Sequence, residues 1–494
     1  MATKEHQVVI VGGGITGLAM ALMLEKLDVD YVLLEAYKTI TPNLGASIGL
    51  LPHGERVLDQ LGCWDALRER SMPFERVVLR DGVSGRRVRT WPFGDVLERR
   101  HGYPSVFTSR YELLCVMHER VRDKHRILTE TSVERVETHP DHALVRCAGG
   151  GTIRAQVVVG ADGVHSTVRR EMWRNADEAG DEGWIPARDR APVPVEYGCV
   201  FGTASKRPRA LVPGETVLAS GPGLIATLMS GPDGTAFFFN YWELPKDRQL
   251  YELDKLPRFT EKDKAEQTAL GGHLIISDGG ATMGEMVAEA KSSSGVTSIP
   301  VYLMRRWHHG RLVILGDAAH KFNPLTGMGG NGCLDSCAAL VSELHARGLL
   351  GPDQKDGPWP LASVSAAFAA TEAERVPRLA PLVGSSESAS RVLAWQKGWH
   401  KALLLYLLPL VPASVMLRPQ SVECARSPGA RFIPAPDRPH EWKFADEQEA
   451  AGQGGLAGRA LAALVPVLVA VLAAWTIKGG YAPARLGLVG FGSV

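Results

Sequence analysis

Three glycines near the N-terminus have the spacing that binds the phosphates of a dinucleotide. Gly12, Gly14 and Gly17 form a GxGxxG pattern directly after the β-branched run at residues 8–11. In a strand–turn–helix unit, the first glycine permits a tight turn and the second lets the backbone approach a pyrophosphate. The third lets helix and strand pack closely, and the amides that open the helix donate to the phosphates.

A second apolar run, at residues 31–34, ends in Glu35. A carboxylate at this place accepts a ribose hydroxyl and favours an unphosphorylated ribose, as in FAD or NAD. The strand–turn–helix–strand–acid unit is therefore complete. Residues 452–457 match GxGxxA, but a polar stretch precedes them, so no strand feeds that turn and we expect one dinucleotide domain.

Two more segments combine an apolar strand with an aspartate and glycines. Residues 157–169 (VVVGADGVHSTVR) lead into Asp162, and residues 312–335 (LVILGDAAHKFNPLTGMGGNGCLD) place Asp317 at the end of a strand. An aspartate there suits a ribityl or ribose hydroxyl, and amides near residues 329–332 suit an electron-rich ring. Either segment alone is also consistent with a structural turn, whereas all three motifs in this order are more specific.

Together these segments resemble the single-component FAD-dependent monooxygenases, the aromatic-hydroxylase-like class that includes salicylate and para-hydroxybenzoate hydroxylases. The resemblance covers residues 6–345. It implies an α/β fold in which a Rossmann-type FAD-binding domain is interleaved with an antiparallel-sheet substrate domain, followed by C-terminal helices. It also implies FAD as the cofactor, with NADPH as a transient co-substrate that has no domain of its own, and O₂ as the oxidant.

The resemblance also implies roles for single residues. It assigns Glu35 to the adenosine ribose, Gly49 to the crossover loop beside the flavin, Arg110 to a contact with FAD, Asp317 to the ribityl chain, Gly330 and Asn331 to the amide wall at the flavin's pyrimidine end, and Asp162 to the phosphates of FAD and NADPH. Met328 stands where many members have glutamine, so the flavin-side contacts differ in detail.

A narrower likeness is to fungal membrane-associated FAD monooxygenases that epoxidise prenyl chains of meroterpenoids or indole diterpenes. It rests on residues 45–62 (GASIGLLPHGERVLDQLG), the loop after Asp317 and an apolar C-terminal tail. Along the chain we therefore expect these regions: FAD-binding at 6–189 and 301–350, substrate-binding at 190–300, C-terminal helices at 351–425, a linker at 426–459 and a membrane span at 460–477.

The substrate region alternates apolar and small residues around a turn at 231–234, which is typical of antiparallel strands. Its aromatic residues, Phe237 and Phe239 among them, suit either a sheet core or the floor of an apolar pocket. Tyr197 and Tyr241 are the candidate catalytic hydroxyl donors. A phenol substrate needs a base, but an isolated alkene does not.

We find no base motif here and expect His320, in the GDAAH segment, to be structural. These features favour epoxidation of an olefin of a prenylated intermediate in secondary metabolism. The alternatives are ring hydroxylation of a phenolic acid, flavin-dependent reduction of an isoprenoid, and a flavoprotein that only binds a partner.

Charge and cysteine content exclude other classes. The 494 residues carry 55 Lys+Arg against 54 Asp+Glu. A net charge of +1 gives no positive electrostatic field that would attract nucleic acid. The seven cysteines include no CxxC pair, which favours reduced thiols and gives no support for a structural zinc or another metal site.

The C-terminal part holds two apolar stretches. Residues 460–477 lack charge and, at about 1.5 Å per residue, are long enough to cross a thin bilayer. We expect a single-pass anchor, in the endoplasmic reticulum, with the catalytic body in the cytosol; a buried Ala-rich helix is the alternative. Residues 402–417 are broken by Pro409 and Pro412, which favours packing on the body or shallow membrane contact.

Overall fold

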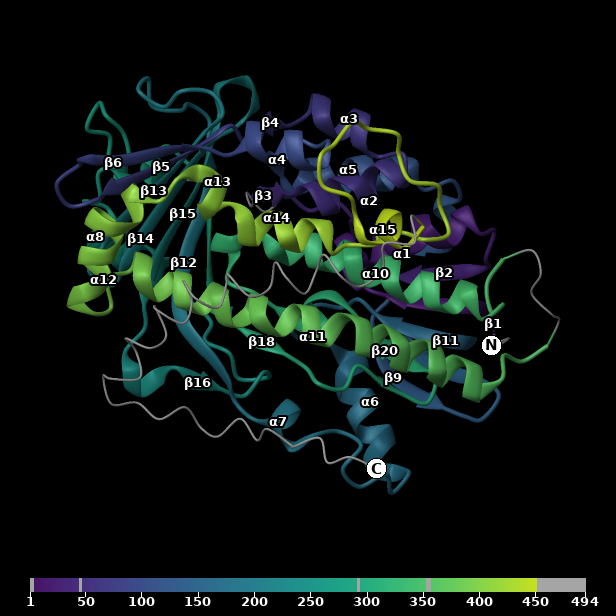
Figure 1. Cartoon of the computed structure of the whole chain (residues 1–494). Coiled ribbons are helices and arrows are strands. Elements are labelled where there is room, and N and C mark those ends of the chain that lie inside the picture. The colour runs from purple at the N-terminus through teal and green to yellow at the C-terminus, as the bar shows by residue number, and fades with distance from the viewer. Residues whose placement is uncertain (1–3, 44–46, 291–293, 352–356, 451–494) are drawn as a thin grey trace, which may run out of the picture.

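The computed structural model describes residues 4–43, 47–290, 294–351 and 357–450. Two large sheets lie side by side, and the long helix α11 runs along both (Figure 1). The predicted span at 460–477 lies outside the described residues. Within them, no helix combines the length and the apolar character needed to cross a membrane.

The first sheet has a parallel centre, because its strands β8, β2, β1, β11 and β20 pair in that spatial order in one direction. The middle strands are apolar and buried, as expected for a sheet covered on both faces. Its strands are β1 (Lys4–Val11), β2 (Tyr31–Leu34), β8 (Ile127–Leu128), β9 (Val133–Thr138), β10 (Ala143–Cys147), β11 (Thr152–Gly160), β19 (His308–His309) and β20 (Leu312–Ile314).

Helices pack on this sheet and on one another. Helix α1 contacts β1 and β2 and has α5 and α10 beside it, whereas α6 covers β9, β11 and β20. The helices of this half are α1 (Ile15–Lys26), α2 (Pro52–Gln60), α3 (Trp64–Glu69), α4 (Gly94–His101), α5 (Arg110–Arg120), α6 (Thr167–Glu178), α7 (Ala187–Arg190) and α10 (Met328–Ala346).

The second sheet is mainly antiparallel and has the order β16-β12-β15-β14-β13-β5-β6, with β17 also on β12. Strands β5 and β6 come from the segment assigned by sequence to the first FAD-binding part, so this sheet extends beyond 190–300. The strands are β5 (Arg76–Asp81), β6 (Arg87–Pro92), β12 (Val193–Ala204), β13 (Glu215–Gly221), β14 (Leu224–Ser230), β15 (Ala236–Glu243), β16 (Leu250–Tyr251) and β17 (Ser294–Pro300). Helices α8 (Glu261–Gly271) and α9 (Met283–Glu289) accompany it.

Two small sheets complete the body. They contain β3 (Ser47–Leu50), β4 (Met72–Pro73) and β7 (Val106–Ser109), and β18 (Tyr302–Leu303) with β21 (His320–Lys321). The C-terminal helices are α11 (Leu361–Leu393), α12 (Gly398–Ala402), α13 (Ala413–Met416), α14 (Arg418–Ala425) and α15 (Ala445–Ala450).

The stretch 426–450, which we expected to be a linker, instead packs on the FAD-binding half as a strap. The amide of Gln60 donates to the carbonyl of Ala430 at 3.0 Å, and Arg56 forms a bidentate ion pair with Asp446 at 2.9 and 2.8 Å. The proline and glycine content of this stretch predicts an unpacked linker. For residues 426–450 that prediction is wrong, because these long-range contacts hold the strap on the body.

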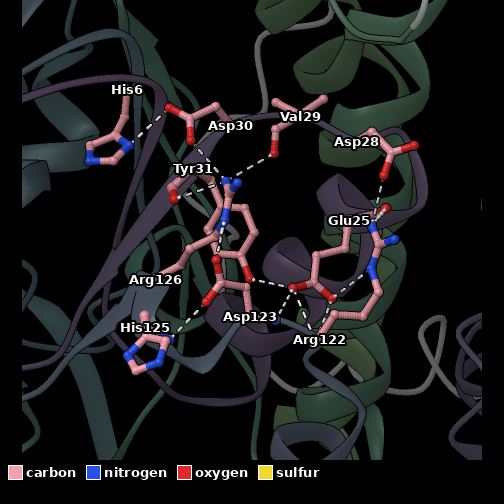
Figure 2. Close-up of polar contacts among 10 residues, drawn as sticks. All are labelled: His6, Glu25, Asp28, Val29, Asp30, Tyr31, Arg122, Asp123, His125 and Arg126. Carbon is pink, nitrogen blue, oxygen red and sulfur yellow. Dashed lines mark hydrogen bonds and ion pairs between the residues drawn. The ribbon is translucent and has the colours of Figure 1, made fainter.

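An ion-pair network fastens the edge of the first sheet (Figure 2). Arg126 pairs with Asp30 at 2.9 Å, and the backbone amide of Arg122 donates to Glu25 on α1 at 2.9 Å. The Tyr31 hydroxyl also donates to Glu25, at 3.1 Å. Each exposed pair adds roughly 0–1 kcal/mol at most. The network therefore matters for position: it joins the segment after α5 to α1 and β2, which carry the dinucleotide motif.

Candidate active site

The glycine loop has the backbone geometry that the motif predicts. Gly12 has a φ of +104°, and a Cβ there would lie 2.5 Å from the carbonyl oxygen of Ala161. Only glycine fits such a position without strain. A Cβ at Gly17 would overlap the carbonyl of Gly12, so the third glycine lets α1 approach the turn. The loop is thereby tight, and Gly14 stands at the N-cap of α1.

Glu35 lies beside this loop at the end of β2. Its carboxylate accepts hydrogen bonds from the amides of Gly13 at 2.6 Å and Tyr37 at 2.9 Å. These bonds fix the acid at the mouth of the loop. This geometry is compatible with the ribose contact expected for Glu35.

Arg110 brings positive charge to the same place. It opens α5, whose first turn is capped by the Ser109 hydroxyl accepting from the Glu112 amide at 3.0 Å. A Cβ at Gly14 would lie 3.6 Å from an Arg110 guanidinium nitrogen. Burial lowers the pKa of Arg110, whereas the carboxylate of Asp317 acts to raise it. In the described part of the chain its guanidinium has no hydrogen-bond acceptor, and a pyrophosphate at the start of α1 would supply one.

Asp317 follows β20 in a short 3₁₀ turn at Gly316–Ala318. Its side chain is about one-third exposed and pairs with Lys321 at 2.5 Å. A Cβ at Gly316 would collide with the Thr16 hydroxyl, so this turn packs on the start of α1. Asp317 therefore lies next to the glycine loop and Arg110, as a ribityl ligand requires.

Asn331 connects the loop after β20 to the crossover segment at Gly49. Its side-chain amide donates to the carbonyls of Gly49 at 3.0 Å and Gly327 at 2.6 Å, and its oxygen accepts from the amide of Leu51 at 3.0 Å. The side chain is fully buried. Backbone amides, rather than this side chain, are thus left to form the wall expected at Gly330.

Gly329 and Gly330 bring no side chain to the row of backbone amides expected beside the flavin. A Cβ at Gly330 would collide with Ile48, whereas the position beside Gly329 is open, with no heavy atom within 4 Å. Met328 is buried at the first turn of α10. The open backbone beside Gly329 leaves space for a planar ring.

Asp162 is used as a helix cap. Its carboxylate accepts from the Ser166 hydroxyl at 2.5 Å and from the amides of Thr167 and Val168 at 2.7 and 3.0 Å. Burial raises its pKa. The Cα of Asp162 also faces the tight turn at Gly12. Its expected contact with phosphates stays a prediction, and the carboxylate itself holds the start of α6.

A separate apolar cluster, which we call the sheet-face cluster, lies between the second sheet and α11. Its buried core is Tyr197, Cys199, Ile225, Tyr241, Ile299, Val301 and Ala394. Leu325, from the loop after Asp317, packs against it together with Phe239 and Val383. The sheet-face cluster thus reaches the loop at residues 318–327, between Asp317 and α10, which we call the flavin loop and where we expect a substrate to meet the ring.

Both candidate tyrosines belong to this cluster. The Tyr197 hydroxyl accepts from the side-chain amide of Gln396 at 2.8 Å, and Tyr241 stacks on Phe239 with ring centroids 6.0 Å apart. Burial raises the pKa of both phenols well above the usual value. Both phenols are therefore neutral at physiological pH, and the Tyr197 hydroxyl is held by a hydrogen bond.

Next to the cluster is a cavity of about 370 Å³ between the start of β12, the segment after β17 and α11. Its walls include Pro194, Val301 and Val383, while Arg188 and Arg305 stand at a polar part. A smaller adjoining cavity of about 10 Å³ reaches Tyr197 and Asn323 of the flavin loop. This space is the candidate substrate chamber.

Sequence reasoning missed the contribution of α11. Glu387 borders both cavities, and burial raises the pKa of its carboxyl. Val383, Glu387, Ser390 and Ala394 follow the i, i+4, i+7, i+11 spacing of one helix face. That spacing is the only signal that could have found them, and it does not distinguish a cavity wall from a core.

His320 is structural, in keeping with the expectation. It is buried, its Nε2 lies 3.1 Å from the Ser336 hydroxyl, and burial lowers its pKa to about 3. All seven cysteines are free thiols. Among the described residues there is no group of three or more His, Cys, Asp or Glu that could hold a metal ion.

This chain is similar to known proteins in sequence and in fold. The FAD binding domain family matches residues 5–216 and 285–348. The FAD-dependent monooxygenase atmM of Aspergillus flavus is 32% identical over 445 residues, 89% of each chain. The FAD-dependent monooxygenase cle3 of Aspergillus versicolor is 35% identical over 417 residues, 83% of this chain and 81% of its own.

A solved structure, Klebsiella pneumoniae HpxO complexed with FAD and uric acid, shares the fold. Its TM-score is 0.68 at 20% identity, over 85% of this chain and 96% of that one. The tight glycine turn, the Arg110 guanidinium beside it and the open backbone at Gly329 fit FAD. The chain belongs to the FAD-dependent monooxygenases of the FAD binding domain family, and FAD is its cofactor.

Proposed function

We propose that this enzyme uses NADPH and O₂ to epoxidise an olefin of a prenylated meroterpenoid or indole-diterpene intermediate in secondary metabolism. The observation that carries the proposal is the sheet-face cluster, which presents an apolar surface to the flavin loop at Leu325. The carboxyl of Glu387 borders the adjoining cavities but is not a member of this cluster. The phenols of the cluster are neutral and buried, so the cluster itself supplies no base. An alkene needs none, whereas a phenol does.

FAD, when bound, supplies the redox chemistry that activates O₂. The residues of the chain bind FAD and the substrate, orient them and exclude water. Arg110 and the start of α1 would hold the pyrophosphate, and Asp317 the ribityl hydroxyls. The sheet-face cluster keeps water away from the reacting atoms and orients an apolar chain by packing.

One observation favours a second candidate, ring hydroxylation of a phenolic acid. Arg188 and Arg305 line the 370 Å³ cavity, and a guanidinium can bind a substrate carboxylate. The carboxyl groups of Glu387 and Asp189 line the same cavity and disfavour a bound substrate carboxylate. The apolar sheet face therefore leads us to rank epoxidation first.

We also propose that the protein is held at a membrane of the endoplasmic reticulum by residues 460–477, with its catalytic body in the cytosol. The support is the uncharged apolar stretch, flanked by Arg459 and Lys478. A bilayer location suits a prenylated substrate, because such a molecule partitions into lipid.

The test is NADPH oxidation by the purified yellow protein with and without a farnesylated aromatic under ¹⁸O₂. One labelled oxygen in an epoxide or its diol supports the proposal. A labelled ring hydroxyl on a phenolic acid supports the second candidate instead. Turnover of the alkene that proceeds without O₂ identifies a reductase and refutes both.

A further inference from the structure

The segment that runs from α12 to α13 lies at one end of the second sheet (Figure 1). It carries large apolar side chains that are exposed. We call them the apolar tip. Its members and their exposed fractions are Trp399 37%, Tyr406 64%, Leu407 58%, Leu410 77% and Val415 46%. These five exposed side chains lie within 17 positions of the chain, whereas exposed apolar residues on a surface are normally scattered singly.

The backbone of the tip is fixed, so these side chains are held outward. Leu404 and Leu405, in the same π-helical turn as Tyr406, are 1% and 3% exposed. The indole of Trp91 on β6 donates to the carbonyl of Val411 at 3.1 Å, and Arg100 donates to that of Ser414 at 3.1 Å. The inner residues are thus packed on the body while the outer ones are presented to the surroundings.

The charged residues of the segment itself are all cationic. Residues 388–422 contain no Asp or Glu, and Lys397 and Lys401 are exposed beside Trp399. Arg86 lies over the ring of Tyr406, 6.0 Å from its centroid. Apolar side chains with tryptophan, tyrosine and a cationic border are the composition of segments that lie in a membrane interface.

We propose that the apolar tip inserts shallowly into the surface of a bilayer that contains anionic lipid. This contact is separate from the anchor proposed at 460–477 and rests on described residues alone. Two tips facing each other would bring Lys397 and Lys401 against their copies, and residues 388–422 supply no acidic partner, so the charge of the segment opposes a tip-to-tip dimer. Anionic headgroups supply the missing negative charge.

The tip is close in sequence to the substrate chamber. Ala394, a member of the sheet-face cluster, precedes Trp399 by a short turn, and its carbonyl accepts from the Gly223 amide at 2.7 Å. A tip in the interface therefore brings the end of α11 and the cluster near the lipid.

The test uses the full chain with an environment-sensitive fluorophore on Leu410→Cys. Tyr37→Cys is the control, because Tyr37 is 75% exposed and follows β2, at the other end of the molecule from α12 (Figure 1). Labelled parent protein supplies the background from the partly exposed Cys115. The vesicles are phosphatidylcholine alone or phosphatidylcholine with phosphatidylserine at about 7:3, in plain and chain-brominated forms.

We expect a blue shift, a several-fold rise in emission and quenching by brominated chains at position 410, strongest with phosphatidylserine. Lys397→Glu with Lys401→Glu should remove most of this response. The proposal is wrong if position 410 responds no more than position 37 while the protein pellets with vesicles. It is also wrong if the shift at 410 grows with protein concentration without lipid, because that identifies a second copy. Neither result depends on the substrate oxidised.

Discussion

Asn331 on α10 donates a hydrogen bond to the carbonyl of Gly49 on β3 across 3.0 Å. The two residues are 282 positions apart, and the same side chain also accepts from Leu51. One buried amide thus sets the spacing between the crossover segment and the flavin loop.

Asn331→Ala should therefore weaken both the fold and FAD retention. It leaves the Gly49 carbonyl and the Leu51 amide without their partner, a loss of about 1–3 kcal/mol for buried polar groups. We expect a lower Tm for the FAD-free protein and faster FAD loss on gel filtration. Ser342→Ala, which removes one hydrogen bond from the Arg431 amide elsewhere on α10, gives the cost of losing a single bond away from Gly49 and Leu51. An unchanged Tm for Asn331→Ala would contradict this account.

Arg110→Ala should weaken FAD binding by roughly 10- to 100-fold, the value of one or two charge-assisted hydrogen bonds to phosphate. Arg110→Lys should recover part of the loss, because it restores charge but not the planar fork. FAD titration followed by flavin fluorescence measures both. Equal affinity in all three proteins would exclude Arg110 from the cofactor site.

Asp317→Ala should release FAD from the purified protein, because the ribityl hydroxyls lose their acceptor. Asp317→Asn keeps an acceptor oxygen and should retain more flavin. The ratio of absorbance at 450 nm to that at 280 nm reports the loading. A fully yellow Asp317→Ala protein would refute the ribityl assignment.

Tyr197→Phe removes the hydroxyl that accepts from Gln396. If the substrate is an alkene, kcat should change by no more than about threefold, because no proton has to leave. A catalytic base would cost about 100-fold or more and change the pH profile. Tyr241→Phe is the matched variant. Steady-state rates from pH 6 to 9 separate the two cases.

Glu55→Gln should raise stability at neutral and alkaline pH. Glu55 is buried, one carboxylate oxygen accepts from the Ser105 amide at 3.2 Å, and the other has no partner among the described residues. Burial raises the pKa of Glu55 well above its ordinary value. The stabilisation of the folded state by protonated Glu55 is therefore fully present below the ordinary glutamate pKa. It is lost as the pH rises through the pKa that Glu55 has in the folded protein.

Thermal unfolding from pH 4.5 to 8.5 tests this sign. The Tm of Glu55→Gln should match that of the parent at the acid end and exceed it by a few degrees at the alkaline end. Glu69→Gln, at an exposed carboxyl on α3, is the control. If the Tm difference between Glu55→Gln and the parent narrows as the pH rises, the predicted pH dependence is wrong.

The FAD half was predictable because its signals are local. Gly12, Gly17 and Glu35 lie in one strand–helix–strand unit. A Cβ at Gly17 would collide with the carbonyl of Gly12 in the same unit, and a Cβ at Gly12 would collide with the backbone just after the neighbouring strand β11. The place of Asp317 after a strand was predictable for the same reason, since an apolar run and a glycine-rich turn mark it in sequence, and its contact with the ribityl chain stays a prediction.

Long-range pairings left no such signal. The parallel pairing of β5 with β13 joins residues far apart, and nothing in 76–81 indicates it. The contact of Tyr197 with Gln396, the wall formed by Glu387 and the packed strap at 426–450 likewise depend on how separate parts of the chain come together. Sequence patterns describe single elements, whereas these features belong to pairs.

The pairing of β11 with β20 has a consequence for biosynthesis. Residues 312–314 complete the sheet that holds the glycine loop, and Asp317 and α10 follow them. A nascent chain that has left the ribosome only as far as β17 therefore has Gly12 and Glu35 but lacks half of the flavin cradle. Cofactor capture has to wait until about two-thirds of the polypeptide has emerged, and until then β11 lacks its parallel neighbour β20.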